Sequence, residues 1–541
     1  MKKYSIIFLF ICTTIFSQTQ FINSNHLIYD YLQYSNVLGT LKKYDNIIIP
    51  LSQKKINGII KQLEKVDDFS SNLNYSFIDN KNKGYFLDSL GIISESFIAK
   101  CETNVLQYSD SILSLSANPI FSFKNININS SNAALITYGG LIKLNYGENI
   151  TAVLEANNGY VAGERSTASY DKRVSQSFTF NHTKLDYFDG TRGYFNYESD
   201  HLSVFAGRNE IIWGLSKTNP LVLGNFGQNM DFLKVDFSYK KFRYTFLHGW
   251  LVTPRTSVYI DSLVGDVRRK NSKYIAANRI GYQPNDNIRL GISQIILYAN
   301  RPIELAYINP FLLWESAQRS QNDLDNSFLN LDFSWLITNG LQVQSTLTFD
   351  DINFDLWLNG NWNTPNNRIA WQIVTNITYP YLPKNLLLTL DYAQIRPFTY
   401  SHPEINESLS YTNNGFPLGS YLKPNSIALT MELKWFVNSN FLLSARYDNI
   451  RHGENEYDKD GNLLFNHGGS YNLSTTLILS SKSPKILDGK LTSIDRINFA
   501  AKYYLSYFVN FDVLLSFEKE NSVGKSLNNK NFIFNLNYNL F

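Results

Sequence analysis

The chain alternates apolar and polar side chains over stretches of about ten residues, and this period of two restricts its fold more than any other feature. Clear examples are residues 341–350, 368–379, 426–435 and 531–540. Successive side chains of a strand face opposite sides of the sheet, so each stretch predicts a strand with one apolar and one polar face. A wall with lipid on one side and water on the other needs such strands.

Short and long connections alternate between these strands, as they do in outer-membrane barrels. The short connections, which we expect in the periplasm, are residues 146–149, 198–201, 240–241, 283–287, 338–340, 380–385, 438–440 and 506–510. The long connections, which we expect outside the cell or folded into the lumen, are residues 162–189, 209–230, 252–273, 299–325, 351–367, 397–425, 452–495 and 520–530. Residues 470–480 also resemble a strand, but we keep them in a loop because bacterial barrels have an even number of strands.

We therefore predict an all-β transmembrane outer-membrane barrel of about 18 antiparallel strands over residues 116–541. The last strand is aromatic and ends at Phe541, which is the usual ending of such barrels. A water-soluble β-sandwich or propeller also alternates, but it would have shorter strands and would pack its aromatic residues between sheets. The length of the strands, the 35 Tyr and 37 Phe residues, and an export signal favour the barrel.

Residues 1–17 have the composition of a secretory signal peptide. Two lysines precede an apolar run from Tyr4 to Phe16, and Ser17 is a small residue suited to cleavage. Cleavage would leave Cys101 as the only cysteine, which excludes an internal disulfide and a cysteine-based metal site. Loss of the two lysines would lower the formal charge from +3 to +1, which argues against nucleic acid as a partner.

Residues 18–115 show the period of helices instead. Ser52 stands at an N-cap position, and Ile56, Ile59 and Leu63 follow at helical spacing. Further short helices are predicted by the spacing of Leu27, Tyr31 and Tyr34 and of Leu87, Leu90, Ile93 and Ile98. We therefore predict a small N-terminal α-helical domain in the periplasm that caps or plugs the barrel. A disordered spacer is the alternative, but the apolar content is enough for a small core.

Several long strings of residues are shared with one known family. They are HLIYDYLQYSNVLGTL and IIIPLSQKKINGIIKQL within residues 26–63, FAGRNEIIWG at 205–214, RPIELAYINPFLLWESAQRSQNDLDNSFLNLDF at 301–333, TFDDI at 348–352, RPFTYSHPE at 396–404 and GFPLGSYLKPNS at 415–426. The most specific are residues 304–311 and 415–426. Through these strings, which span nearly the whole mature chain, the sequence resembles the Wzi family of capsule-assembly outer-membrane proteins, in the form common in Bacteroidetes.

The resemblance implies an eighteen-stranded barrel with a periplasmic helical bundle. It implies a non-enzymatic lectin that attaches or helps assemble capsular polysaccharide or exopolysaccharide at the cell surface, and it brings no catalytic motif and no cofactor. The partners that it implies are this polysaccharide, outer-membrane lipid and the polysaccharide export machinery, with the chain acting as a monomer.

Glycan binding needs aromatic faces for sugar rings, and amides, carboxylates and arginines for hydroxyl or acidic groups. Three long loops contain such mixtures. The glycan-binding candidates are Trp314, Arg319, Asp323, Asp325, Asn326, Trp357, Trp362, Arg396, Tyr400, His402 and Tyr411. An aromatic residue of a barrel belongs more often to the belt at the membrane interface, but the loop positions of Trp357 and Trp362 argue against this for those two.

Inward strand positions carry charges of both signs, and two interpretations remain open. Paired charges would lock the lumen, whereas unpaired charges would line a pore and make the chain a passive or substrate-selective porin. We expect pairing, with long loops such as 299–325 and 397–425 folded into the lumen. The charged residues are Arg243, Arg289, Arg368, Arg446 and Lys434 with Asp236, Asp332, Asp350, Asp391 and Glu432.

A third hypothesis, an outer-membrane hydrolase, has little support. The seven histidines lack metal-ligand spacing such as HExxH, so we predict no metal site. A catalytic set of Ser, His and Asn could be assembled, but in a chain this rich in Ser and Asn it is expected by chance. We therefore predict a non-enzymatic protein of the outer membrane.

Overall fold

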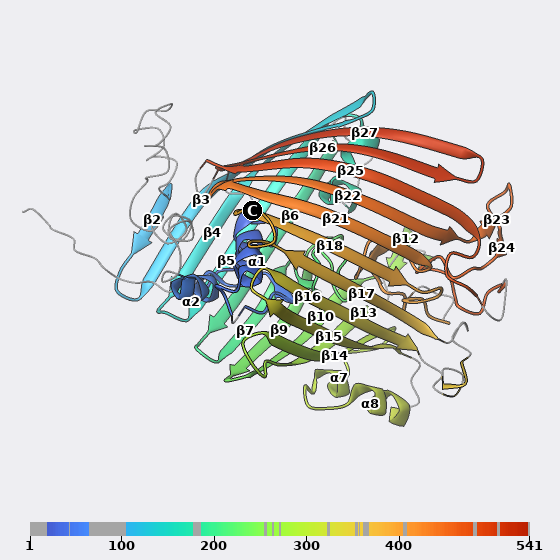
Figure 1. Ribbon diagram of the computed structural model, residues 1–541, viewed down its shortest axis with the longest axis horizontal. Coiled ribbons are helices and arrows are strands. Elements are labelled where there is room, and N and C mark those ends of the chain that lie inside the picture. Colours follow the sequence, from blue (N-terminus) through green and yellow to red (C-terminus); the bar gives the residue numbers. More distant parts are fainter. Residues whose placement is uncertain are drawn as a thin grey trace, which may run out of the picture.

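The computed structural model is a closed antiparallel β-barrel (Figure 1). It describes residues 19–42, 44–63, 104–176, 186–253, 257–261, 265–269, 272–321, 325–351, 355, 358–360, 367–403, 408–479, 484–505 and 509–538. In this part of the chain eighteen strands form the ring, which closes where β27 pairs with β3. The strands of the ring are β3 (Leu113–Ile128), β4 (Ser131–Tyr146), β5 (Ile150–Gly163), β6 (Asp186–Glu198), β7 (Leu202–Asn209), β9 (Met230–Tyr239), β10 (Phe242–Val252), β13 (Ser272–Tyr282), β14 (Ile288–Ala299), β15 (Asn326–Thr338), β16 (Leu341–Asp351), β17 (Arg368–Ile377), β18 (Leu386–Ile395), β21 (Ser426–Asn438), β22 (Phe441–Glu454), β25 (Lys490–Tyr504), β26 (Val509–Ser522) and β27 (Lys525–Tyr538).

Smaller elements lie inside, around and at the ends of this ring. The strands are β1 (Ile48–Ile49) with β8 (Ile212–Trp213), β11 (Ser257–Asp261) with β12 (Gly265–Arg269), β19 (Thr412–Asn413) with β20 (Phe416–Pro417), β23 (Glu456–Tyr457) with β24 (Leu463–Phe465), and β2 (Leu106–Ser109), which pairs with β3. The helices are α1 (Leu27–Leu38), α2 (Gln53–Leu63), α5 (Arg165–Ala168), α6 (Lys172–Gln176), α7 (Leu305–Ile308) and α8 (Trp314–Gln321). Among the described residues, none of the helices is both long and apolar enough to cross a membrane.

The alternation of the sequence becomes the two faces of the wall. On β15, Leu329, Leu331 and Trp335 are exposed on the outer face, whereas Asp332 and Ser334 between them are buried on the inner face. An apolar outside and a polar inside are what lipid and a filled lumen require. The predicted barrel and its number of strands are confirmed.

The two ends of the barrel differ in their connections. Short connections such as residues 240–241 lie at one end, which we call the turn end, and long connections such as residues 209–230 lie at the other, which we call the loop end. At the loop end, residues 520–530 were expected to form a long loop, and this is wrong. Strand β26 continues to Ser522 and β27 begins at Lys525, because Gly524 adopts the positive φ that a tight turn needs. Residues 470–479 stay outside the ring, as expected, with one isolated bridge from Leu479 to Asn466.

The two described N-terminal helices match their predicted positions. Ser52 is the N-cap of α2, since its Oγ accepts a hydrogen bond from the Lys55 N–H at 3.2 Å. The helix expected near residues 87–98 and the signal peptide lie outside the described residues. Strand β3 begins at Leu113, slightly before the expected boundary at residues 115 and 116.

Candidate functional site: a pocket at the loop end

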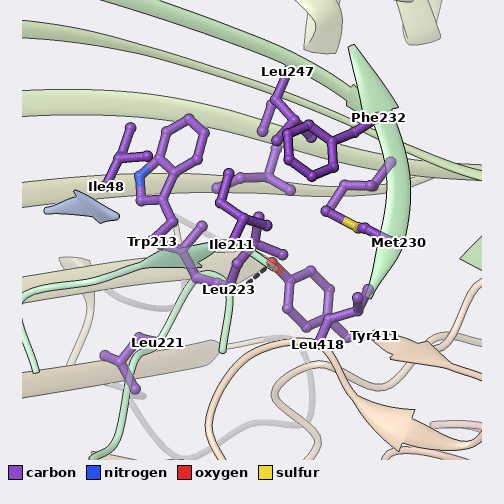
Figure 2. Close-up of a cluster of buried hydrophobic side chains, with 14 of the residues drawn as sticks. Ile48, Ile211, Trp213, Leu221, Leu223, Met230, Phe232, Leu247, Tyr411 and Leu418 are labelled. Atoms are coloured by element: carbon purple, nitrogen blue, oxygen red, sulfur yellow. Dashed lines mark hydrogen bonds between the residues drawn. The ribbon is translucent and has the colours of Figure 1, made fainter. Parts of the chain in front are cut away.

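Loops from the loop end fold into the lumen and build an apolar core there. Figure 2 shows Trp213, Leu221 and Leu223 from the β7–β9 loop packed with Tyr411 and Leu418 from the β18–β21 loop. Inward side chains of the wall, including Phe232, Leu247, Ile275 and Ile295, complete this core. The prediction that the long loop at 397–425 enters the lumen is therefore confirmed.

The N-terminal segment fills the lumen from the turn end. Strand β1 pairs with β8 of the β7–β9 loop, so segments that enter from opposite ends meet in one small sheet. Polar contacts fix α1 to the wall: Lys434 lies 3.0 Å from the Asp30 carboxylate, and Arg289 donates to the Asn36 side chain at 2.9 Å. Together, the loops and the N-terminal segment fill the lumen along β9 to β18, and α1 also packs against β21 and β22.

The predicted pairing of the inward charges is confirmed for eight of the ten, which form ion pairs, whereas Arg289 and Asp391 bond to neutral groups. The contacts are Arg243 with Asp236 at 3.4 Å, Asp332 with Arg279 at 2.7 Å, Arg368 with Asp350 at 3.6 Å and with Asp351 at 2.8 Å, Lys434 with Glu432 at 3.0 Å, Arg446 with Asp448 at 2.8 Å, Arg289 with Asn36 and the Tyr44 carbonyl, and Asp391 with Ser216 at 2.6 Å and Gln372 at 2.8 Å.

A small pocket lies above this plug, at the loop end of β7 and β9. Leu223, Met230 and Leu418 supply an apolar floor, and they belong to the core drawn in Figure 2. The polar lining residues are Asn209, Glu210, Asn225, Gln228 and Asn413.

The polar groups of the pocket are held in fixed positions. The Glu210 carboxylate accepts hydrogen bonds from the Ser24 N–H at 2.6 Å and from the Asn225 amide. The Asn413 side-chain oxygen accepts from the Val252 N–H at 2.8 Å. The Oδ1 atom of Asn209 is buried with no hydrogen-bond donor from the described residues. A buried acceptor without a partner is unfavourable, and a ligand hydroxyl would satisfy it.

Aromatic side chains lie beside this pocket, near the wall formed by β22 to β26. Tyr421 is 66% exposed and its ring lies 5.9 Å from that of Phe226, next to the pocket residue Asn225. Tyr170, 53% exposed, lies between α5 and α6, and its hydroxyl is within electrostatic range of Tyr421 and of Arg496. We call Tyr170, Phe226 and Tyr421 the aromatic rim. Lys172 of α6 joins the rim to the pocket, because its ammonium group donates to Asn225.

The structure places most of the predicted site residues elsewhere. Tyr400 and Tyr411 are buried in the plug, where their rings stack at 5.1 Å and their hydroxyls donate to the carbonyls of Leu221 and Val222. Their faces are closed to a sugar ring, so we expect them to hold the loops together. Arg396 begins the same loop, and His402 accepts a backbone hydrogen bond from Thr475 at 3.3 Å.

The candidates in the loop after β14 lie apart from the pocket. Trp314 is buried on α8, on the outer side of the wall, and Arg319 is on the same helix. Asp325 pairs with Arg301 at 2.8 Å, and Asn326 faces the lumen, where it donates to the Leu409 carbonyl at 2.8 Å. The expectation that residues 299–325 fold into the lumen is wrong. Asp323, Trp357 and Trp362 lie outside the described residues.

The sequence-based prediction missed the pocket itself. Asn209, Glu210 and Asn225 lie in the long loop 209–230, whose amides and carboxylate were a visible signal. The mixtures of aromatic and polar residues were expected in other loops, and of the pocket residues only Asn413 belongs to one of those loops. Among the described residues, no group of three or more His, Cys, Asp and Glu side chains is arranged to hold a metal ion.

A closed eighteen-stranded ring with an apolar outside and a lumen filled from both ends defines a plugged outer-membrane β-barrel. The chain belongs to the family of the capsule assembly protein Wzi, whose family model matches residues 131–477. No curated protein sequence matches the chain at a significant level.

Solved structures show a similar fold. Wzi of Escherichia coli, described as an outer-membrane protein involved in group 1 capsule assembly and a carbohydrate-binding β-barrel, has a TM-score of 0.57 at 12% identity, covering 95% of this chain and 98% of that one. OprD of Pseudomonas aeruginosa has a TM-score of 0.43 at 11% identity, covering 78% of this chain and 94% of that one. OccAB4 of Acinetobacter baumannii has a TM-score of 0.43 at 9% identity, covering 79% and 97%. Both of these likenesses are weaker than the likeness to Wzi of Escherichia coli.

Proposed function

We propose that this chain is a non-enzymatic outer-membrane lectin that attaches or helps assemble capsular polysaccharide or exopolysaccharide at the cell surface. Membership of the capsule-assembly family supports the proposal, as does the likeness to a barrel described as carbohydrate-binding. On this proposal the loop end faces the outside of the cell, and α1 and α2 lie on the periplasmic side, where the export machinery would meet them.

The observation that carries the proposal is the pocket above the plug. A sugar hydroxyl would donate to the unpartnered Asn209 oxygen, and a neighbouring hydroxyl would donate to the Glu210 carboxylate. A neighbouring sugar of the chain would stack on the exposed ring of Tyr421. Asn209 and Tyr421 are therefore the two residues whose loss should weaken glycan binding most.

The test uses the purified full-length barrel and the capsular polysaccharide of its own strain. We expect Asn209→Ala and Tyr421→Ala each to lower the affinity about tenfold, the loss of one good hydrogen bond or stacking contact. Asn359→Ala is the matched control, because Asn359 is an exposed amide on a different loop, and it should bind as the wild type does. If neither pocket variant lowers the affinity while both melt as the wild type does, the pocket is not the glycan site.

A cellular experiment tests the role apart from the site. A deletion strain should still make polysaccharide but release it into the medium. Cell-bound polysaccharide at the wild-type level would exclude the attachment role, whatever the pocket binds.

A porin is the competing function, and one observation favours it. Inward side chains of β22, β25 and β26, such as Arg446, Arg496 and Glu518, remain half-buried. Conductance across a planar bilayer separates the two functions, because a plugged lectin should give no stable open channel. Large and stable channels would support the porin.

A further inference from the structure

Residues 301–321 form a helical hairpin on the outside of the barrel, and we call it the outer hairpin. It comprises α7 and α8, which lie below β14 and β15 in Figure 1. Its inner side packs on outward-facing residues of the wall. The buried members of this contact are Phe246, Ala276, Ile296 and Tyr298 of the wall with Tyr307 and Trp314 of the hairpin.

Both ends of the outer hairpin are fixed at the loop end of the wall. Arg301 pairs with Asp325 at 2.8 Å, and the Tyr307 hydroxyl donates to the same carboxylate at 2.6 Å. The Ser272 hydroxyl donates to the Arg301 carbonyl at 2.8 Å. The hairpin therefore starts and ends near the loop end and points toward the turn end.

Wall side chains satisfy the backbone at the tip of the hairpin. The Tyr244 hydroxyl donates to the Pro310 carbonyl at 2.6 Å, and the Gln294 side chain accepts from the Trp314 N–H at 3.1 Å. The Trp314 ring nitrogen donates to the Asn309 carbonyl at 3.2 Å. Backbone groups at membrane depth must be satisfied within the protein, and these contacts satisfy three of them.

The tip lies at the depth of the hydrocarbon. Tyr244 is near the turn-end limit of β10, which begins at Phe242, and Trp250 lies toward the loop end of the same strand. The eight steps from Phe242 to Trp250 cover about 26 Å along the strand and about 20 Å along the membrane normal at a tilt near 40°. A lipid-facing apolar band is about 25 Å tall, so contacts with Tyr244 fall within it.

The wall beneath the hairpin carries polar residues where lipid would otherwise lie. His248 and Asn278 face outward and are buried, and the His248 ring bonds to the Tyr298 hydroxyl at 2.7 Å. Polar side chains on a bare lipid-facing wall are strongly unfavourable. The hairpin is therefore an integral layer of the wall.

The far side of the outer hairpin is apolar and exposed. Phe311 at the tip is 90% exposed, with its ring 6.4 Å from that of the wall residue Tyr244, and Leu305 and Leu313 are 82% and 66% exposed. The bare wall beside the hairpin presents residues of the same kind, among them Ile292 and Leu329. The charged pair of Arg319 and Glu315, 3.0 Å apart, lies on α8, whose last residues return toward the loop end, where charged groups reach the membrane interface.

We propose that the outer hairpin is a re-entrant element of the outer membrane, with Leu305, Phe311 and Leu313 in contact with the acyl chains of membrane lipid. The hairpin continues the lipid-facing surface outward and fixes the barrel in the bilayer. This proposal is independent of glycan binding. A second copy of the chain and a soluble partner are the other occupants that the experiment must separate.

The experiment uses the full-length chain in liposomes, with Cys101 replaced by Ser. Phe311→Cys reports on the hairpin, and Asp460→Cys is the matched control at an exposed turn. A charged, water-soluble maleimide should label Asp460→Cys at least tenfold faster than Phe311→Cys. A fluorophore attached at residue 311 should be quenched by lipids with brominated acyl chains, and one at residue 460 should not.

Two results would overturn the proposal. Equal labelling at the two positions would place Phe311 in water. Slow labelling at residue 311 without quenching by brominated lipid would mean that protein covers it, and a disulfide between two copies through residue 311 would identify that protein as a second copy.

Discussion

The inner faces of two halves of the barrel differ although both arise from the same alternation. Along β9 to β18 the inward charges are buried: the side chains of Arg279 and Asp332 are 2% and 4% exposed. Along β22 to β26 the corresponding pair, Arg496 and Glu518, is 26% and 15% exposed. We call these the filled half and the open half. Alternation makes the inner face polar, and the loops and helices that pack against this face decide whether its charged side chains are buried.

The connections explain the difference between the halves. The filled half receives the loops 209–230 and 396–425 and the N-terminal segment. The open half ends at β26, which a tight turn at Gly524 joins to β27, and the neighbouring β3 and β4 are joined by another tight turn at Asn129. Such turns supply no residues to cover the inner face. Near the loop end, α5 and α6 cover part of this face instead, and the aromatic rim lies beside them.

The largest expected effect is a difference in stability between two variants, each of which removes one arginine from a different half. Arg279→Ala leaves the buried Asp332 carboxylate without its cation and leaves Asp45 paired with Arg243, and breaking a buried pair in this way costs about 3 to 5 kcal/mol. Arg496→Ala leaves Glu518 close to water, and an exposed pair contributes about 0 to 1 kcal/mol. Urea unfolding of each variant in the same lipid measures the difference. Equal losses would contradict the division into a filled and an open half.

Acid should weaken the contact between the plug and the filled half. Burial alone would raise the pKa of Asp45, but Arg279, Arg243 and Arg289 outweigh it and lower this pKa to about 2. The carboxylate therefore contributes stability above its ordinary pKa of 3.8, and this is lost as the pH falls toward 2. We expect a loss of about 2 kcal/mol between pH 4 and pH 2, measured as the free energy of unfolding in urea.

Asp45→Asn is the control for this loss. The variant should be less stable than the wild type at pH 6 but should lack the part of the acid dependence that Asp45 contributes. If both proteins lose the same free energy between pH 4 and pH 2, Asp45 does not anchor the plug.

The smallest expected effect on stability is in the aromatic rim. Tyr170→Ala and Tyr421→Ala remove exposed rings, and such surface changes are usually within about 0.5 kcal/mol. Their effect should appear in glycan affinity and leave the melting temperature unchanged. A large loss of stability in either variant would mean that the rim packs against the plug. The rim would then belong to the filled half.

Much of the fold could be predicted from local pattern. Alternation of Leu329, Leu331 and Trp335 with polar neighbours predicts a wall, and the spacing of Ile56, Ile59 and Leu63 predicts α2. The turn at Gly524 was missed because a polar stretch with strand period looks like a loop in the sequence. Only pairing of Asn521 with Ser526 reveals that both strands extend beyond the apolar band.

The site was less accessible to sequence analysis than the wall. The composition of the loops predicted that Trp314, Tyr400 and Tyr411 face a sugar. Whether these side chains are buried depends on the side of the wall on which each loop lies. The loop 397–425 enters the lumen, whereas the equally aromatic segment 301–321 lies outside. Both contain apolar and polar residues, and no local pattern separates the two routes. The unpartnered oxygen of Asn209 can be recognised only in a structure, where the position of each hydrogen-bond donor around it is known.

The small sheet of β1 and β8 has a consequence for biogenesis. Ile48 and Ile49 enter from one end of the ring, and Ile212 and Trp213 enter from the other. Their pairing needs the segment around Ile48 to lie within the ring, and the ring itself is completed only when β27 meets β3. Contacts between residues so distant in sequence form slowly. The insertion machinery therefore has to accommodate the N-terminal segment inside the wall before β27 pairs with β3 and closes the ring.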